Sequence, residues 1–128
     1  MTNIKNISES ELTFVLMGAI KVYNLTPHTL NVIDRDGNVT VIPASGAIAR
    51  VATEEILVGR LGFSEVVQRR FGDVDWGFDM PQMKKDTVYI VSSLVASAIK
   101  DRHDILVPGT LVRNDEGQPI GCKGFAMV

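Results

Sequence analysis

Short apolar segments alternate with turn residues along most of the chain, a pattern typical of a protein built from short strands. Leu30 and Val32 alternate with polar neighbours, and Asp36-Gly37 forms a strong hairpin-turn signal. The apolar segments predict strands at residues 20–25, 29–33, 39–42, 47–52, 56–61, 66–71, 87–91, 105–107, 111–113 and 120–127. Turns at this spacing favour a sandwich or barrel-like core.

Two segments depart from this strand pattern. Ser92 or Ser93 can cap a short helix that runs to Ile99, with its apolar residues on one face. Residues 72–86 are rich in Gly, Asp and Pro and also carry the only tryptophan, so they predict a long irregular stretch. A loop with large apolar side chains either covers the core or lines a site.

The first residues have a helical rather than a strand pattern. Ser8 and Glu11 fit a capping box, and Leu12, Val15, Leu16 and Ala19 follow at helical spacing. We therefore expect an N-terminal arm at residues 1–16, helical if it docks, and a single domain at residues 17–128. The alternative is a leader without fixed structure, because termini become ordered only when they are tied down.

Composition supports a mainly β fold and limits the classes of function. The 128 residues include 16 Val, 11 Ile and 8 Thr, which suit a pleated sheet. The formal net charge of −2 argues against binding to nucleic-acid polymers. No apolar stretch is long enough to span a bilayer, no secretory signal is evident, and a single cysteine excludes an internal disulfide. We expect a soluble protein of a reducing compartment.

The usual catalytic and metal-binding patterns are weak in this chain. His28, His103 and Cys122 could in principle supply a Cys–His pair, but a lone cysteine in a strand is more often a small buried hydrophobe. The aspartates between Asp73 and Asp86 lack the spacing of a calcium loop. We therefore predict no catalytic residue, no metal site and no cofactor.

A few basic and aromatic residues suggest a small-ligand site instead. Arg102 and Arg113 lie at the ends of predicted elements, where guanidinium groups can clamp a phosphate. Trp76, Phe78 and Met83 could supply a flat apolar partner for a base. The alternatives are ordinary surface arginines and aromatic residues that cover the core.

Several segments occur in the same order in a known family of phage proteins. They are Asn24-Leu25-Thr26-Pro27-His28, Pro43-Ala44-Ser45-Gly46 with Ala49-Arg50-Val51, Tyr89-Ile90-Val91-Ser92, Leu111-Val112-Arg113 with Gly117, and Ile120-Gly121-Cys122-Lys123-Gly124-Phe125. From about residue 20 to the end, the chain resembles the first-described type of Thoeris anti-defence sponge. The resemblance implies a decorated β-sandwich with a helix at the dimer interface.

The resemblance also implies a function and a site. Sponges of this family bind a cyclic ADP-ribose isomer made by bacterial TIR proteins and sequester it uncleaved, and some form dimers or hexamers with separate sites for cyclic oligonucleotides. Arg113 matches the family's phosphate-binding arginine, with Asn114 as a neighbouring polar contact. Ser93 stands where the family has Asn, and Met83 stands near its stacking aromatic, which Trp76 or Phe78 would replace.

The expected function is therefore non-enzymatic sequestration of a nucleotide messenger, with the protein in the cytoplasm of the infected host. The expected partners are that ligand and further copies of the chain, with no membrane and no nucleic-acid polymer. Two alternatives remain at this point. One is an oligomeric phage structural or assembly protein, and the other is a small hydrolase of the same messenger.

Overall fold

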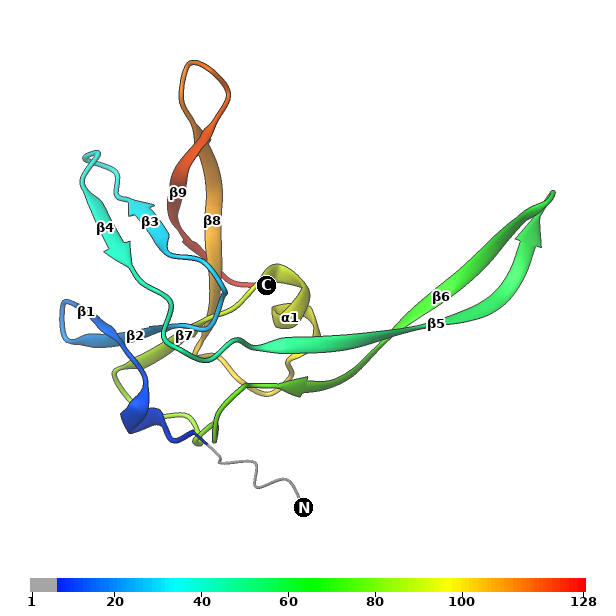
Figure 1. Ribbon diagram of the computed structural model, residues 1–128, viewed down its shortest axis with the longest axis horizontal. Helices are drawn as coiled ribbons and strands as arrows, with labels where there is room; N and C mark the ends of the chain where they lie inside the picture. Colours follow the sequence, from blue (N-terminus) through cyan, green and yellow to red (C-terminus); the bar gives the residue numbers. More distant parts are fainter. Residues whose placement is uncertain (1–6) are drawn as a thin grey trace.

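Seven strands form one curled sheet, and two longer strands form a separate hairpin (Figure 1). The computed structural model describes residues 7–128, with 50% of these residues in strands and 7% in helix, which confirms the mainly β fold. The sheet order is β1-β2-β7-β8-β9-β3-β4. Its strands are β1 (Val15–Met17), β2 (Ile20–Asn24), β3 (Leu30–Ile33), β4 (Val39–Ile42), β7 (Thr87–Ile90), β8 (Ile105–Arg113) and β9 (Pro119–Ala126).

Strand β8 joins the two halves of the sheet. Its first residues pair in parallel with β7, and from Val107 onward it pairs antiparallel with β9. Two separate strands were expected here, around Pro108-Gly109, but the structure has one continuous strand. Gly109 makes this possible, because a Cβ at this position would collide with the carbonyl oxygen of Lys123 on β9. The resulting sheet is nearly closed.

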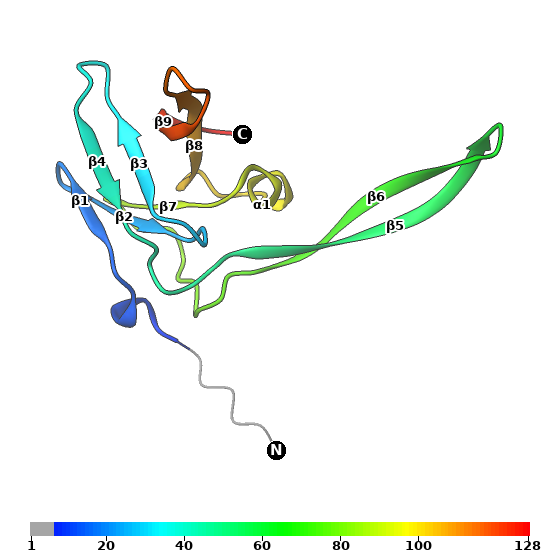
Figure 2. The same ribbon diagram turned by 45° about the horizontal axis from the view of Figure 1, so that its top comes forward.

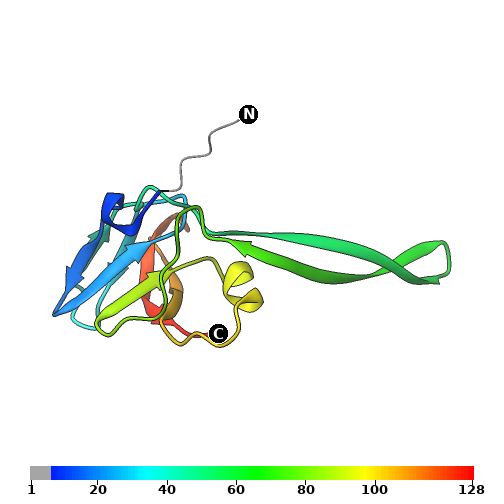
Figure 3. The ribbon, with the colours of Figure 1, turned by 90° about the horizontal axis from the view of Figure 1, so that it is seen from below.

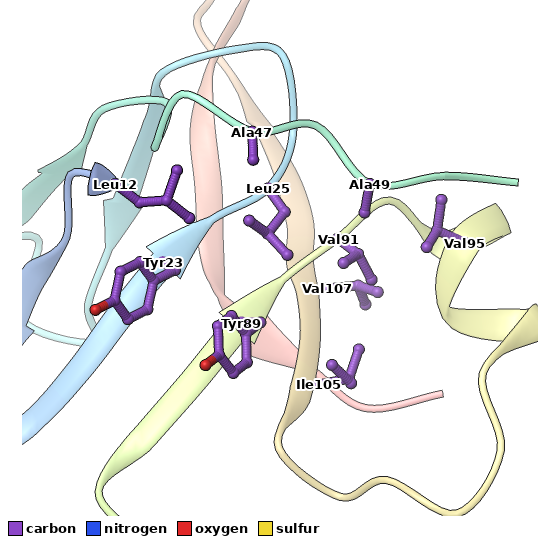
Figure 4. Close-up of a cluster of buried hydrophobic side chains, with 10 residues drawn as sticks. All are labelled: Leu12, Tyr23, Leu25, Ala47, Ala49, Tyr89, Val91, Val95, Ile105 and Val107. Atoms are coloured by element: carbon purple, nitrogen blue, oxygen red, sulfur yellow. The ribbon is translucent and has the colours of Figure 1, made fainter. Parts of the chain in front are cut away.

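The core consists of two apolar clusters on opposite faces of β2 and β7. Tyr23 and Tyr89 stack at 5.4 Å between ring centroids in the larger cluster, which also includes residues from the N-terminal segment, the loop after β4 and the helix (Figure 4). Val22 and Ile90 point the other way, as alternation along a strand requires. They meet β3, β4 and β9 inside the curled sheet. Cys122 belongs to this second cluster, which confirms that it is buried.

The expected helix is confirmed as α1 (Ser93–Ala98). Ser92 caps it by accepting a hydrogen bond from the backbone N–H of Val95 at 3.3 Å. Val95 is buried in the larger cluster, so the helix is fixed to the core by its first turn. Among residues 7–128, this short helix and every other helical turn lack the length and apolar character needed to cross a membrane.

The helix predicted after Ser8 is wrong. Only a single 3-10 turn forms, at Glu9–Glu11, and the Ser8 hydroxyl bonds that of Ser10 rather than capping the turn. Residues 15–17 instead form β1, which pairs antiparallel with β2. The free edge of β2 supplies backbone partners that outweigh the weak local helix preference. Residues 1–6 of the predicted arm lie outside the described residues.

One carboxylate anchors the N-terminal segment to the core. Glu9 accepts a hydrogen bond from the Tyr89 hydroxyl at 2.7 Å and also pairs with Lys84. Partial burial alone would raise the pKa of Glu9, but these two partners outweigh it and leave the pKa below its usual value of 4.5. The same contact and burial raise the pKa of Tyr89, so this phenol stays a hydrogen-bond donor.

Acidification is therefore expected to release this segment before the rest of the fold. A carboxyl group with a lowered folded-state pKa contributes stability above its unfolded pKa and loses it as the pH falls through the folded value. The hydrogen-exchange protection factors of the amides of Leu12 and Thr13, which bond Glu9 and Ser45, should fall selectively below about pH 4.5. Glu9→Gln should remove that pH dependence, whereas Glu11→Gln, at an exposed position, should keep it. Equal protection at pH 7 and pH 3 would contradict this role for Glu9.

The hairpin of β5 (Arg50–Leu61) and β6 (Ser64–Asp75) projects away from the sheet (Figures 1 and 2). The strand pair expected at 56–61 and 66–71 is confirmed, but both strands are longer than predicted. The strand expected at 47–52 contributes only its last residues, and residues 47–49 lie over the core instead. The irregular stretch begins after Asp75 rather than at residue 72.

Candidate functional site

Four of the predicted site residues lie on one side of the larger cluster. Trp76 and Phe78 come directly after β6, and the Phe78 ring lies 6.2 Å from that of Tyr89. Arg102, from the turn after α1, lies over the Trp76 ring at 5.7 Å. Met83 and Arg102 both line a shallow hollow of about 270 Å³. The irregular stretch therefore covers the core and also forms part of a surface hollow.

The guanidinium group of Arg102 is already occupied within the chain. Its Nε and Nη2 donate to the two carboxylate oxygens of Asp104 at 3.0 and 2.7 Å, and Nη1 donates to the carbonyl oxygen of Pro81 at 2.9 Å. The bond to Asp104 raises the pKa of Arg102. This bidentate pair neutralises the charge that a phosphate would need. Through its bond to Pro81, Arg102 instead holds the loop after β6 against the core.

Ser93 lies apart from this group, at the start of α1. Beside it is a pocket of about 370 Å³ between the helix and the base of β5, lined mainly by apolar side chains, with Arg50 as its one charged residue. Leu94 and Val51 form part of the apolar wall. The neighbouring Ser92 also lines the pocket, although its hydroxyl is engaged as the helix cap.

Arg113 and Asn114 lie at a third place, where β8 turns into β9. Arg113 is exposed and donates to the carbonyl oxygen of Gly117 at 2.8 Å. The Asn114 side chain accepts the backbone N–H groups of Glu116 and Gln118, so it shapes the turn. This turn and α1 lie at different ends of the β8–β9 hairpin (Figure 1).

The segment from Asn24 to His28, one of those that carry the resemblance, has a structural role. Asn24 is fully buried, and its Nδ2 donates to the carbonyl oxygens of His28 and Ile42 at 2.7 and 3.1 Å. Its Oδ1 accepts the backbone N–H and the hydroxyl of Thr26 at 2.9 and 2.6 Å. Both polar atoms of the side chain are thus fully hydrogen-bonded, and these bonds hold a sharp turn between β2 and β3.

An open hollow lies between β3, β8 and β9. It has a volume of about 800 Å³ and a mainly apolar lining that includes Leu30, Leu111 and Ile120. His28 and Cys122 both line this hollow, whereas His103 is exposed in the turn after α1 and is not part of its lining. Among residues 7–128, no group of three or more His, Cys, Asp or Glu side chains could hold a metal ion.

One chain thus brings together Trp76, Phe78, Met83 and Arg102 but separates them from Ser93, Arg113 and Asn114. Sequence reasoning missed Arg50 as a pocket residue. The only signal was its place in the Ala49-Arg50-Val51 segment, next to an apolar strand. Across residues 7–128 the ion pairs are Lys84–Glu9 and Arg102–Asp104, so neither Arg50 nor Arg113 has a carboxylate within 4.0 Å. Arg50 lines the pocket beside α1, although it lies opposite Asp75 in the strand register, and Arg113 is exposed where β8 turns into β9.

Comparison with models of protein families, with curated proteins and with solved structures finds no match to this chain.

Proposed function

We propose that the protein binds and sequesters a cyclic ADP-ribose-type nucleotide messenger without cleaving it, and so blocks Thoeris immunity. The observation that carries this proposal is the pocket beside α1, in which one guanidinium group without a carboxylate partner faces an apolar wall. A diphosphate with an attached base needs this combination of a cation and an apolar surface. The segments that resemble the sponge family, and that occur in the same order along the chain, support the same function.

In this proposal each part of the pocket has a separate role. Arg50 clamps the diphosphate, and Leu94 with Pro27 offers an apolar face to the base. Arg113 and Asn114 lie elsewhere in the same chain, so they reach this ligand from a second copy. A pocket completed by two copies encloses more of a ligand than so short a chain can alone. Sequestration at nanomolar affinity requires about −12 kcal/mol of binding free energy.

The proposal is tested by incubating the purified protein with the product of a TIR enzyme, filtering, and then heating the retained protein. We expect the messenger to disappear from the filtrate and to be recovered intact after heating, as measured by mass spectrometry. Recovery of an altered nucleotide would instead indicate a hydrolase. If the messenger stayed in the filtrate at protein concentrations far above its own, the proposal would be wrong.

Arg50→Gln and Arg113→Gln are each expected to weaken binding by roughly 10- to 100-fold in calorimetry. A charge-assisted hydrogen bond to a phosphate contributes about 1.5–3 kcal/mol, and each 1.4 kcal/mol is tenfold in affinity. Arg35→Gln, in the exposed turn between β3 and β4, removes the same charge far from the pocket and should bind as the unmodified protein does. If the Arg113 variant kept full affinity, Arg113 would not belong to the site. The affinity of the Arg50 variant would then be the test of the pocket beside α1.

A second candidate function is an oligomeric structural or assembly component of a phage particle. The projecting hairpin favours it, because assembly proteins use such extensions to grip neighbouring copies. This candidate predicts assembly that depends on protein concentration and no effect of the messenger. The filtration experiment therefore separates the two functions.

A further inference from the structure

The β5–β6 hairpin has almost no contact with its own domain beyond its base. Each strand has 12 residues, which at about 3.3 Å per residue gives a length of roughly 40 Å. All three orientations show it extending away from the curled sheet (Figures 1, 2 and 3). An isolated two-stranded hairpin is marginally stable in water, so this one needs a surface to pack against.

The hairpin is apolar on both faces and at its tip. On β6, Val67 and Phe71 alternate with Val66, so the two faces both carry exposed apolar side chains. At the tip Leu61 is 78% exposed and Phe63 is fully exposed. The exposed apolar side chains of the hairpin are Leu57, Val58, Leu61, Phe63, Val66, Val67 and Phe71. Exposed apolar side chains in this number on one projecting hairpin indicate an interaction site.

The charges of the hairpin nearly balance one another. Across the register Glu54 lies opposite Arg70, Glu55 opposite Arg69, and Arg60 opposite Glu65, an arrangement that favours strand pairing. Four Arg and five Asp or Glu residues between Arg50 and Asp75 give the hairpin a net charge of −1, so it has no excess of positive charge. This balance disfavours a nucleic acid or an anionic membrane and favours an apolar protein surface.

The exposed area of the whole chain is larger than a compact monomer requires. A compact protein of 14.0 kDa exposes about 6,700 Å², whereas this chain exposes 8985 Å². Counting residues 1–6 as fully extended chain accounts for roughly 1,000 Å² of the difference. The remainder exceeds the roughly 800 Å² that each partner buries in a stable protein interface.

The same chain carries a matching surface for the apolar tip. The groove between β3, β8 and β9 holds about 800 Å³, and two of its side chains, Leu111 and Ile120, are about half exposed. The tip of the hairpin lies at the far end of the molecule from this groove (Figure 1). The extended hairpin therefore cannot place its tip in its own groove, but it can place it in the groove of another copy.

We propose that the β5–β6 hairpin grips a second copy of this chain, with Phe63 seated in the groove between β3, β8 and β9. Reciprocal exchange of two hairpins gives a closed twofold dimer, in which each chain contributes one tip and one groove. This contact does not depend on the nucleotide. It specifies which surface of a second copy receives the hairpin, and it is separate from the proposed ligand pocket, because Arg50 lies at the base of the hairpin, roughly 40 Å from its tip.

The first test is sedimentation of the full chain without ligand. The unmodified protein should sediment as an assembly of at least two chains of 14.0 kDa. Phe63→Asp should weaken self-association by about 100-fold or more, because each dimer buries two such rings. Its melting temperature as a dilute monomer should be unchanged, since Phe63 touches nothing in its own core. Leu16→Asp, an equally drastic change at exposed β1, should sediment as the unmodified protein does.

The second test locates the contact. A photoreactive benzoylphenylalanine at position 63 keeps the tip aromatic and should crosslink to isotope-labelled chains at residues 108–111 or 119–122. Ile120→Asp should reduce this crosslink at least tenfold. A monomeric unmodified protein, or a Phe63→Asp variant that still associates fully, would overturn the proposal. Crosslinks confined to another part of the second copy would overturn the groove as the seat of Phe63. Messenger binding measured on the Phe63→Asp monomer reports separately on the proposed function.

Discussion

Asn24→Asp is expected to lower the free energy of unfolding by about 3 kcal/mol or more, equivalent to a drop in melting temperature of roughly 10 °C. The substitution changes one amide nitrogen to oxygen at a position with no exposed surface. The carbonyl oxygens of His28 and Ile42 then lose their donor and face a carboxylate oxygen instead. Each buried polar group without a partner costs about 1–3 kcal/mol, and a buried charge costs more.

The pH dependence distinguishes this explanation from a general loss of packing. Burial beside two carbonyl oxygens should raise the folded-state pKa of the new carboxyl group above its unfolded value. The variant should therefore lie closer in stability to the unmodified protein at pH 4 than at pH 7, when both are compared at the same pH. Asn31→Asp makes the same chemical change at an exposed position of β3 and should cost less than about 0.5 kcal/mol. A deficit that is equal at both pH values would exclude the buried charge as its cause.

Asp104→Ala is expected to cost about 3 kcal/mol, measured by urea unfolding. Asp104 is only 5% exposed and neutralises Arg102, whose side chain is 17% exposed. Removing one partner of a buried pair typically costs about 3–5 kcal/mol, and the lower end applies here because Arg102 keeps some contact with water. The loop with Trp76 should loosen, since Arg102 also bonds the carbonyl oxygen of Pro81 and lies over the Trp76 ring. Tryptophan fluorescence should shift to longer wavelength.

A double variant separates the effect of the unpaired charge from that of the packing around it. Arg102→Met combined with Asp104→Leu leaves no unpaired charge and should recover at least half of the lost stability. Asp79→Ala, which removes an exposed carboxylate in the same irregular stretch, should change the stability by less than about 0.5 kcal/mol. If the double variant were as unstable as Asp104→Ala, the cost would come from lost packing rather than from an unpaired guanidinium group.

Local patterns predicted most of the strands and the helix because those elements depend on neighbouring residues. The Ser92 cap, the Asp36-Gly37 turn and the alternation around Leu30 each act within a few positions. The N-terminal prediction failed for the opposite reason. The capping-box pattern at Ser8 competed with the free edge of β2, and that edge is not visible in the local sequence. The break expected at Pro108-Gly109 failed in the same way, because β9 holds β8 straight through it.

The candidate site was only partly predictable. The chemistry of Arg102 was identified, but its neutralisation by Asp104, two residues away, depends on how the turn after α1 folds against the loop. Arg113 and Trp76 were grouped by residue type, whereas the fold places them in different regions. The strand pair at residues 56–61 and 66–71 was predicted, but its projection away from the sheet was not. Nothing in the alternation of one strand shows whether its apolar face meets its own domain or another molecule.

The pairing of β3 with β9 sets the order in which the protein can mature during synthesis. Val32 on β3 aligns with Cys122 on β9, so β3 cannot complete its pairing until β9 has been synthesised. The β5–β6 hairpin, in contrast, pairs only consecutive segments, so both of its strands are synthesised long before the sheet can close. On the ribosome, the gripping element would be complete while the groove that receives it still lacks β9. The hairpin of a chain still being made would then bind the groove of a finished chain, because two unfinished chains offer each other no complete groove. Assembly would therefore favour partners that have already folded.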